Sequence, residues 1–281
     1  MNYIGAHIDK QKTLLNTMKI ITDNGGNALQ FFASNPRSAK LANIDNFKKD
    51  ASEILEYCKD NNFKLVIHSP YTINLAKELK NGSRTIDIKD CYWVELLLNE
   101  LIIADLIGAI GSVVHVGKYT NLTPEEGLNN MRICIKYIIK NMEGLKLKSK
   151  LILETPAGQG TELLSDLNEF INFYNSFTKE ERKYFKICID TAHLWSSGYD
   201  ILNVFNTILK KNKKDIAVIH FNNSKKDKGS NVDVHASIFE GKIDIDYLEK
   251  IIKIFANNSV IILEEPSKNI HEDFLWFQKN I

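Results

Sequence analysis

The feature that most constrains the fold of this chain is a regular alternation between short apolar segments and segments with helical periodicity. Eight short apolar runs recur along it, at residues 3–7, 28–32, 64–68, 112–116, 151–154, 186–190, 215–220 and 260–264. Between them, apolar residues recur at positions i, i+3, i+4 and i+7, as in Ala51, Ile54, Leu55 and Cys58, in Met131, Cys134, Ile135 and Ile138, and in Leu248, Ile251, Ile252 and Phe255. Strands that are apolar on both faces and alternate with helices are typical of a parallel sheet covered by its crossover helices.

The number of these units predicts a closed barrel. Eight strand–helix units in 281 residues suit a (β/α)8 TIM barrel, which typically needs about 250 residues. No low-complexity stretch or linker rich in proline and glycine divides the sequence, so we expect one domain over residues 1–281. The segment 123–126, TPEE, combines an N-cap hydroxyl, a proline at the first helical position and a capping-box carboxylate, and therefore predicts the start of a helix.

Composition and charge exclude several classes of protein. The formal net charge is +1 and the sequence pI is about 7.6, so no overall field attracts the chain to nucleic acid or to an anionic membrane. The four cysteines lie in apolar segments without CxxC spacing, as expected for reduced core thiols of an intracellular protein. The N-terminus lacks the pattern of a signal peptide, and Asp105 and His115 interrupt the apolar run 101–117, so we expect no membrane span.

Six of the eight predicted strands end on a residue type that commonly binds metals. These residues are His68, His115, Glu154, Asp190, His220 and Glu264. In a barrel of this type the carboxyl ends of all strands meet at one mouth, where active sites are built, so the six side chains should be neighbours. The carboxylates among them would repel one another and would be costly to bury without a positive partner. No predicted strand ends on lysine or arginine, so the compensating charge should be a metal cation.

Three further residues extend this set to five histidines and four carboxylates. In NVDVHAS, Asp233 and His235 are two residues apart, so an extended backbone directs both side chains to the same side. In DTAH, His193 lies on the turn after Asp190. A catalytic zinc typically takes three protein ligands, so this set suits three ions. Imidazole and carboxylate without thiolate favour Zn²⁺, with Mn²⁺ or Fe²⁺ as alternatives, and three divalent ions would attract an anion such as phosphate.

The same residues lie in sequence blocks that resemble a known family. The blocks are YIGAH, HSPYTINLA, LETPAGQG, IDTAHLWSSGYD, HFNNSK, VDVHAS, EGKI and ILEE, and they cover nearly the whole chain. In this order they resemble endonuclease IV, the zinc-dependent apurinic/apyrimidinic (AP) endonuclease of base-excision repair. The resemblance implies a monomeric enzyme that hydrolyses the phosphodiester bond 5′ to an abasic site in duplex DNA, leaving a 3′-hydroxyl and a 5′-deoxyribose phosphate.

The resemblance also implies a role for each matching metal-binding residue. The first zinc would be bound by His68, His115 and Glu154, the second by Glu154 as a bridge with Asp190, His220 and Glu264, and the third by His193, Asp233 and His235. Among these, Glu154, His115 and Glu264 are the expected catalytic residues.

Other positions match the family's contacts to DNA. Arg37 and Tyr71 match side chains that enter the duplex and expose the abasic nucleotide. Lys225, Lys226 and Lys228, in NNSKKDKGS, are expected to contact phosphates. The chain departs from the family's pattern after His7, which we expect to be structural, and at three further positions: Thr72 replaces an apolar residue, Asn223 replaces an acid, and Phe239 interrupts a turn that usually contains glycine.

Two other classes of protein are alternatives. A sugar isomerase or epimerase on a similar barrel also carries histidine and carboxylate at its strand ends. Such an enzyme needs about four ligands around one metal, which would leave His193, Asp233 and His235 without a role. A non-catalytic DNA-binding barrel would be expected to lack some of the ligands and to carry more basic charge, and the sequence has neither property.

Overall fold

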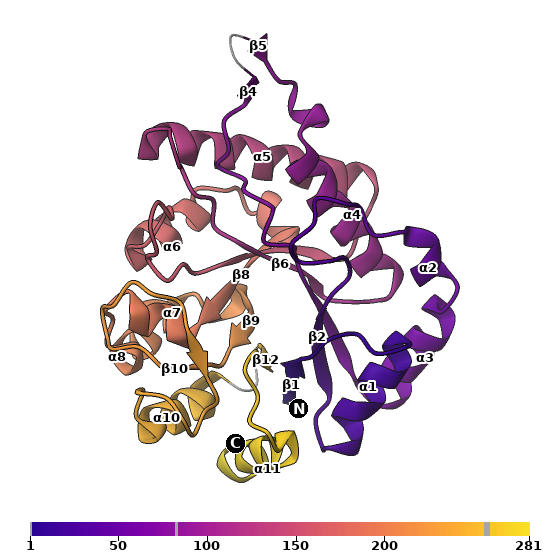
Figure 1. Ribbon diagram of the computed structural model, residues 1–281, viewed down its shortest axis with the longest axis vertical. Coiled ribbons are helices and arrows are strands. Elements are labelled where there is room, and N and C mark those ends of the chain that lie inside the picture. Colours follow the sequence, from indigo (N-terminus) through magenta and orange to yellow (C-terminus); the bar gives the residue numbers. More distant parts are fainter. Residues whose placement is uncertain (1, 82–83, 256–258) are drawn as a thin grey trace.

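The computed structural model describes residues 2–81, 84–255 and 259–281, and its centre is a closed barrel of parallel strands (Figure 1). The barrel strands are β1 (Tyr3–His7), β2 (Ala28–Phe32), β3 (Lys64–His68), β6 (Gly111–His115), β7 (Lys150–Glu154), β8 (Phe185–Asp190), β9 (Ile216–His220) and β12 (Val260–Leu263). They close the barrel in the order β1, β12, β9, β8, β7, β6, β3, β2. The predicted (β/α)8 fold is confirmed.

Helices cover the outside of the barrel and return the chain to the start of the next strand (Figure 1). They are α1 (Leu14–Asp23), α2 (Ile44–Lys48), α3 (Ala51–Asp60), α4 (Tyr92–Leu106), α5 (Pro124–Gly144), α6 (Leu167–Asn175), α7 (Thr191–Ser196), α8 (Ile201–Asn206), α9 (Ile208–Lys211), α10 (Ile245–Phe255) and α11 (Ile270–Asn280). Within the described residues, none of these helices is both long and apolar enough to cross a membrane.

Short 3-10 turns and two-residue strands lie in the loops between the barrel strands and the helices. The 3-10 turns found in the described residues are η1 (Ile88–Asp90), η2 (Glu181–Lys183) and η3 (Lys213–Asp215). Two antiparallel pairs join β4 (Lys80–Asn81) to β5 (Arg84–Thr85), and β10 (Asn223–Ser224) to β11 (His235–Ala236). In Figure 1 the β4–β5 pair projects away from the barrel, whereas β10 lies beside α7.

The predicted elements match the structure closely, with differences at a few ends. The segment 123–126 starts α5 as a complete capping box, in which Thr123 and Glu126 each accept a hydrogen bond from the other's backbone N–H. Glu264 lies one residue beyond β12 rather than on it. Leu55, one of the apolar positions of the helical pattern, is 45% exposed, because α3 buries the face carrying Ala51 and Ile54 while Leu55 lies at its edge near Gly108.

The barrel interior holds an apolar layer of short side chains. They are Ala28, Val66, Val113, Ile152, Cys188, Val218, Val260 and Ile262. Side chains alternate between the two faces of a strand, so the residue two positions further on points into the same interior. That rule places His68 above Val66, Glu154 above Ile152 and His220 above Val218. The apolar layer therefore supports a polar layer at the carboxyl ends of the strands.

The cysteines are core thiols, as predicted. All four are free; Cys91, Cys134 and Cys188 are buried and Cys58 is partly buried. Burial raises the pKa of the Cys134 and Cys188 thiols to about 12. These thiols therefore remain protonated and contribute through packing.

Glu100 on α4 is a buried carboxyl that supports the loop after β2. Its Oε1 accepts a hydrogen bond of 2.9 Å from the Ser34 hydroxyl, and among the described residues its Oε2 has no partner. Burial raises the pKa of Glu100 from 4.5 to about 7. Because the folded state binds this proton more tightly than the unfolded chain, its stabilisation is fully present below pH 4.5 and is lost as the pH rises through about 7.

Glu100→Gln should remove this pH dependence, since glutamine resembles the protonated carboxyl at every pH. We expect the unfolding free energy of the variant, relative to the parent, to rise by up to about 3 kcal/mol between pH 4.5 and pH 8. Urea denaturation of both proteins across this range measures the difference. A difference that does not change with pH would contradict the assignment.

Candidate metal centre

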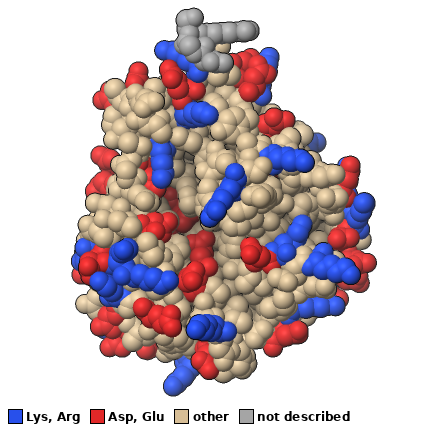
Figure 2. Space-filling model, viewed as in Figure 1, with Lys and Arg blue, Asp and Glu red and all other residues tan. Residues whose placement is uncertain are grey.

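The carboxyl ends of the barrel strands open into a cavity of about 870 Å³. Side chains from several strand ends and the following loops line it, among them His68, His115, His193 and Glu264. Figure 2 shows acidic side chains gathered in a hollow near the middle of the visible face, with Lys and Arg side chains around it. Negative charge is therefore concentrated where the fold predicts an active site.

Three groups of side chains in this cavity have the geometry to hold metal ions, because the ligand atoms of each group lie within 4.8 Å of one another. The groups are His68, His115 and Glu154; Glu154, Asp190, His220 and Glu264; and Asp190, His193 and His235. Glu154 belongs to the first and second groups, and Asp190 to the second and third. The first two groups coincide with the sets that the sequence blocks imply.

The third group differs from the expected set in one carboxylate. It contains Asp190, whereas the sequence blocks imply Asp233. Asp233 is nevertheless adjacent, with its Oδ2 3.3 Å from His193 Nε2 and its Oδ1 3.0 Å from His235 Nε2. Asp190 is also engaged elsewhere, since its Oδ1 accepts the His193 backbone N–H at 2.8 Å and caps α7.

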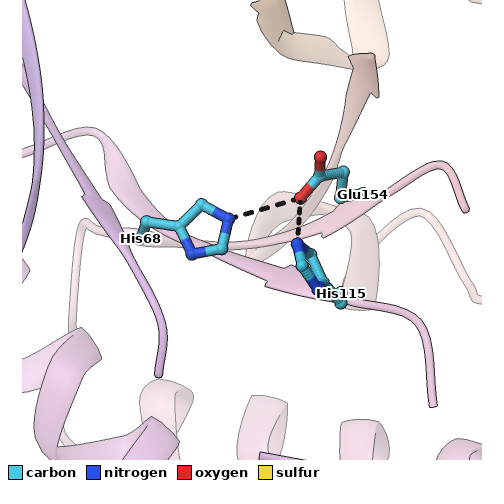
Figure 3. Close-up of side chains that lie close together, drawn as sticks. All are labelled: His68, His115 and Glu154. Atoms are coloured by element: carbon cyan, nitrogen blue, oxygen red, sulfur yellow. Dashed lines mark ion pairs between the residues drawn. The ribbon is translucent and has the colours of Figure 1, made fainter. Parts of the chain in front are cut away.

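Figure 3 shows how the first group converges on one oxygen atom. His68 Nε2 and His115 Nε2 lie 3.4 Å and 3.2 Å from the same Glu154 oxygen, Oε2. Among the described residues, this oxygen is buried without a hydrogen-bond partner, and so are His193 Nε2 and His235 Nε2. Buried polar atoms are normally paired, so these inward-facing atoms fit a cation that is bound between them.

The backbone fixes the tautomers of two of the histidines. His68 Nδ1 lies 2.9 Å from the Ser69 carbonyl oxygen, and His193 Nδ1 lies 2.7 Å from that of Thr155. A carbonyl oxygen only accepts, so each Nδ1 carries the proton and donates it. Nε2 of both rings is then free to bind a metal, which is the usual arrangement of metal-binding imidazoles.

The charges of the cluster are balanced by protons on its histidines. Burial alone lowers the pKa of His193 and His235, but the surrounding carboxylates, Asp190 foremost, outweigh burial and raise both. For His235, Asp190, Asp233 and Glu264 raise the pKa to about 9. A divalent cation would replace these protons, so metal binding at neutral pH should release protons to solvent.

Two buried amides complete the centre, and the sequence analysis missed both. Asn222 Nδ2 donates to Asp190 Oδ2 at 2.7 Å and to Glu264 Oε2 at 3.0 Å, and its Oδ1 accepts the Glu264 backbone N–H at 2.9 Å. Gln30 reaches the second group from β2. A usable sequence signal exists for Gln30: it lies two residues after Ala28 and so points into the barrel.

Asn223, a departure from the family's pattern, closes the loop that carries Asp233 and His235. Its Nδ2 donates to the backbone carbonyl oxygens of Ile238 and Ile243, at 3.0 Å and 2.9 Å. Its Oδ1 accepts the backbone N–H groups of Ser224 and Ile243, both at 2.8 Å. An aspartate could not donate to the two carbonyls, so the amide is specific to this chain's loop conformation.

The residues expected to contact DNA lie at the rim of the cavity or on an adjacent loop. Tyr71 is 58% exposed, lines the cavity, and has its ring centroid 5.9 Å from that of His68. Arg37 is exposed in the loop after β2. Two hydrogen bonds join their loops: Tyr71 N–H donates to the Pro36 carbonyl at 2.9 Å, and the Thr72 hydroxyl donates to the Ser38 carbonyl at 3.0 Å. Thr72, another departure from the family's pattern, therefore has a positioning contact.

The remaining residues singled out in the sequence are also placed. Lys225, Lys226 and Lys228 are exposed in the loop between β10 and β11. His7 lines the cavity with its Nδ1 3.9 Å from Glu264 Oε1, and burial lowers its pKa to about 3. Its ring is therefore neutral.

Comparison with known proteins agrees with the geometry. The family described as xylose isomerase-like TIM barrel matches residues 18–280. A probable endonuclease 4 from Mycoplasmopsis synoviae is 30% identical, covering 94% of this chain and 92% of the relative. The crystal structure of endonuclease IV from Thermus thermophilus has a TM-score of 0.74 at 24% identity, covering 99% of this chain and 96% of its own.

A D-tagatose 3-epimerase-like protein has a TM-score of 0.72 at 17% identity, covering 99% of this chain and 96% of its own. That likeness concerns the fold alone, so the barrel by itself does not separate the two classes of enzyme. The fold and the side chains at its mouth define a xylose isomerase-like TIM barrel whose clustered histidines and carboxylates could bind metal ions. Within that class, the chain belongs to the endonuclease IV family.

Glu154→Gln should disrupt the centre most, because Glu154 is shared by two groups and the substitution removes its charge. We expect bound zinc to fall and zinc affinity to drop by more than the roughly 10–100-fold that loss of an outer hydrogen-bond partner causes. Elemental analysis after dialysis against a zinc buffer measures the loss. His271→Ala is the control, since His271 is an exposed residue of α11 that contacts the Asn24 carbonyl, and it should leave zinc content unchanged. Full zinc content in Glu154→Gln would refute the bridging role.

Proposed function

We propose that this chain is an AP endonuclease that hydrolyses the phosphodiester bond 5′ to an abasic site in duplex DNA. The products are a 3′-hydroxyl on the upstream strand and a 5′-deoxyribose phosphate. The observation that carries the proposal is the set of three overlapping ligand groups in one cavity, joined through Glu154 and Asp190. A single-metal isomerase site would need only one such group. The whole chain, residues 1–281, acts in the proposal as one domain and as a monomer.

The proposed cofactors are three Zn²⁺ ions, with Mn²⁺ or Fe²⁺ as alternatives at individual positions. His68, His115 and Glu154 would bind the first ion, and Glu154, Asp190, His220 and Glu264 the second. His193, Asp233 and His235 would bind the third, with Asp190 adjacent to them. When bound, such ions supply an activated water at neutral pH and neutralise charge on the attacking and leaving oxygens.

Residues of the chain prepare the cavity for a phosphodiester. Glu154, His115 and Glu264 are the proposed catalytic residues, because they face the space between the first two groups. The low pKa of the Glu154 carboxyl, on which burial is outweighed by His220 and His115, keeps it ionised. Asn222 holds Asp190 and Glu264 together by donating to both carboxylates.

Tyr71 and Arg37 are the proposed contacts to the abasic nucleotide and its duplex. Burial and then the nearby Glu264 carboxylate raise the pKa of Tyr71 to about 12, so its phenol stays protonated and can donate a hydrogen bond. The joined loops present the Tyr71 ring and the Arg37 guanidinium as one unit at the rim. An abasic nucleotide has no base to unstack, so its displacement into the cavity costs little.

The first test is incision of a duplex that carries one tetrahydrofuran abasic analogue, by zinc-loaded protein and by protein stripped with a chelator. This analogue cannot undergo β-elimination, so cleavage reports hydrolysis alone. We expect cleavage 5′ to the analogue that is abolished by stripping and restored by zinc. A polymerase should extend the product, because extension requires a 3′-hydroxyl.

Absence of cleavage by zinc-loaded protein would overturn the proposal. Turnover of a ketose by that same protein would then assign the barrel to the sugar epimerases. Cleavage that leaves a blocked 3′ end would retain nuclease activity but refute the proposed products.

Lys225 and Lys226 are the proposed phosphate contacts beside the third group. The double variant Lys225→Ala, Lys226→Ala should bind abasic duplex more weakly, and the slope of log K against log salt should become shallower by about 1 to 2. Fluorescence anisotropy over a salt series measures this slope. Lys140→Ala is the matched control, since Lys140 is exposed near the end of α5 that lies away from the cavity. An unchanged slope in the double variant would remove these lysines from the interface.

A further inference from the structure

Gln30 is a fully buried amide at the centre of the second ligand group. It lies in the middle of β2 and is 0% exposed. Its Oε1 is 2.8 Å from His220 Nε2, and its Nε2 is 2.9 Å from Glu264 Oε1 and 3.0 Å from His7 Nδ1. One amide thus contacts two proposed metal ligands that are 44 residues apart in the chain (220 and 264) and one further imidazole.

The chemistry of these partners determines which way the amide points. A carboxylate only accepts hydrogen bonds, so the atom that faces Glu264 must be the NH₂ group. The carbonyl oxygen of Gln30 then faces His220, and because it also only accepts, His220 Nε2 must carry a proton. The second N–H of the amide is directed to His7 Nδ1, which must accept because the NH₂ group only donates.

This arrangement fixes the nitrogen through which His220 can bind a metal. With the Nε2 proton held by Gln30, a cation can bind His220 only at Nδ1, by replacing the proton that this atom donates to Glu154. That atom lies 2.9 Å from Glu154 Oε1 and 3.3 Å from Glu264 Oε2, within the second group. His68 and His193 have the opposite arrangement, in which backbone carbonyls hold Nδ1–H and leave Nε2 inward.

Gln30 also orients Glu264. Its donated hydrogen bond occupies Oε1 of this carboxylate, while Oε2 faces His220 and Asn222. Glu264 lies directly after β12, where its backbone N–H is bound by the Asn222 side chain rather than by a neighbouring strand. The contact from β2 therefore restrains a ligand that the backbone leaves less constrained.

We propose that Gln30 is a positioning residue that holds His220 in its Nε2-protonated tautomer and Glu264 in the orientation needed to bind the second metal ion. The inference rests on the proposed metal centre but concerns a residue outside the ligand set. It accounts for an amide in a barrel interior whose neighbouring layer is otherwise apolar. Ligand positioning of this kind usually changes metal affinity by roughly 10–100-fold.

Two substitutions separate the contact to His220 from the contact to Glu264. Gln30→Met keeps the length of the side chain but removes the hydrogen bonds to His220, Glu264 and His7. Gln30→Glu keeps an acceptor for His220 Nε2–H but cannot donate to Glu264. Gln278→Met is the matched control, because Gln278 is on α11 and donates to the Gly25 carbonyl away from the cavity.

The experiment combines zinc binding with NMR of histidine ring protons. In parent protein labelled with ¹⁵N-histidine, the His220 Nε2–H should give a slowly exchanging ring proton, assigned by its loss in His220→Asn. Gln30→Met should speed its exchange and shift it upfield, whereas Gln30→Glu and Gln278→Met should retain it. At a free zinc concentration that just saturates the parent, Gln30→Met should hold about two zinc ions per chain instead of about three.

The remaining outcomes distinguish failure of the Gln30 inference from failure of the proposed function. Unchanged zinc content and an unchanged ring proton in folded Gln30→Met would overturn the inference while leaving the metal centre intact. If Gln30→Met does not fold, loss of the ring proton in Gln30→Glu would overturn it, because that variant keeps the acceptor. Failure of the parent itself to bind zinc would instead overturn the proposed function, and the ring proton of zinc-free protein would still report whether Gln30 holds His220.

Discussion

The barrel brings four carboxylates to one mouth, and the structure depends on how their mutual repulsion is offset. Glu154, Asp190 and Glu264 are carried at the ends of β7, β8 and β12, and Asp233 joins them from the loop between β10 and β11. The parallel pairing that closes the sheet also gathers these like charges, so keeping them ionised in the closed barrel is costly without positive charge among them. Protonated imidazoles or metal cations meet that need. The folded barrel and the candidate metal centre therefore depend on the same compensation of carboxylate charge.

Much of the architecture could be predicted because it follows from local rules. The period of two along a strand, and the meeting of parallel strand ends at one mouth, predict six ligands from single positions. Gln30 escaped this reasoning because it does not end its strand, and because its partner Glu264 is 234 residues away. Nothing in the sequence indicated that Asp190 Oδ2 comes within 3.6 Å of His235 Nε2. That approach depends on the path of residues 223–243, which is set by side chain-to-backbone hydrogen bonds of Asn223 rather than by any periodic pattern.

The surface proposed to meet DNA is built on the same rigid scaffold. The loop of Arg37 is fastened at its base through Ser34 to Glu100, and along its length to the segment containing Tyr71 and Thr72. Functional loops of this kind are effective when a scaffold restricts their motion. The neighbouring loop of Lys225 and Lys226 is closed by Asn223. Hydrogen bonds within these loops therefore determine where Arg37, Lys225 and Lys226 are positioned.

The closure of the barrel has a consequence for how the protein is made. β1 pairs with β12, and Glu264, which follows β12, belongs to the second ligand group together with residues of β7, β8 and β9. During synthesis the chain emerges from its N-terminus, so this group cannot assemble until nearly all of the polypeptide described here has left the ribosome. A prematurely terminated product would lack both the closing strand and a ligand. The second ligand group is thus completed only when the barrel itself is complete, and an unfinished copy carries an unfinished centre.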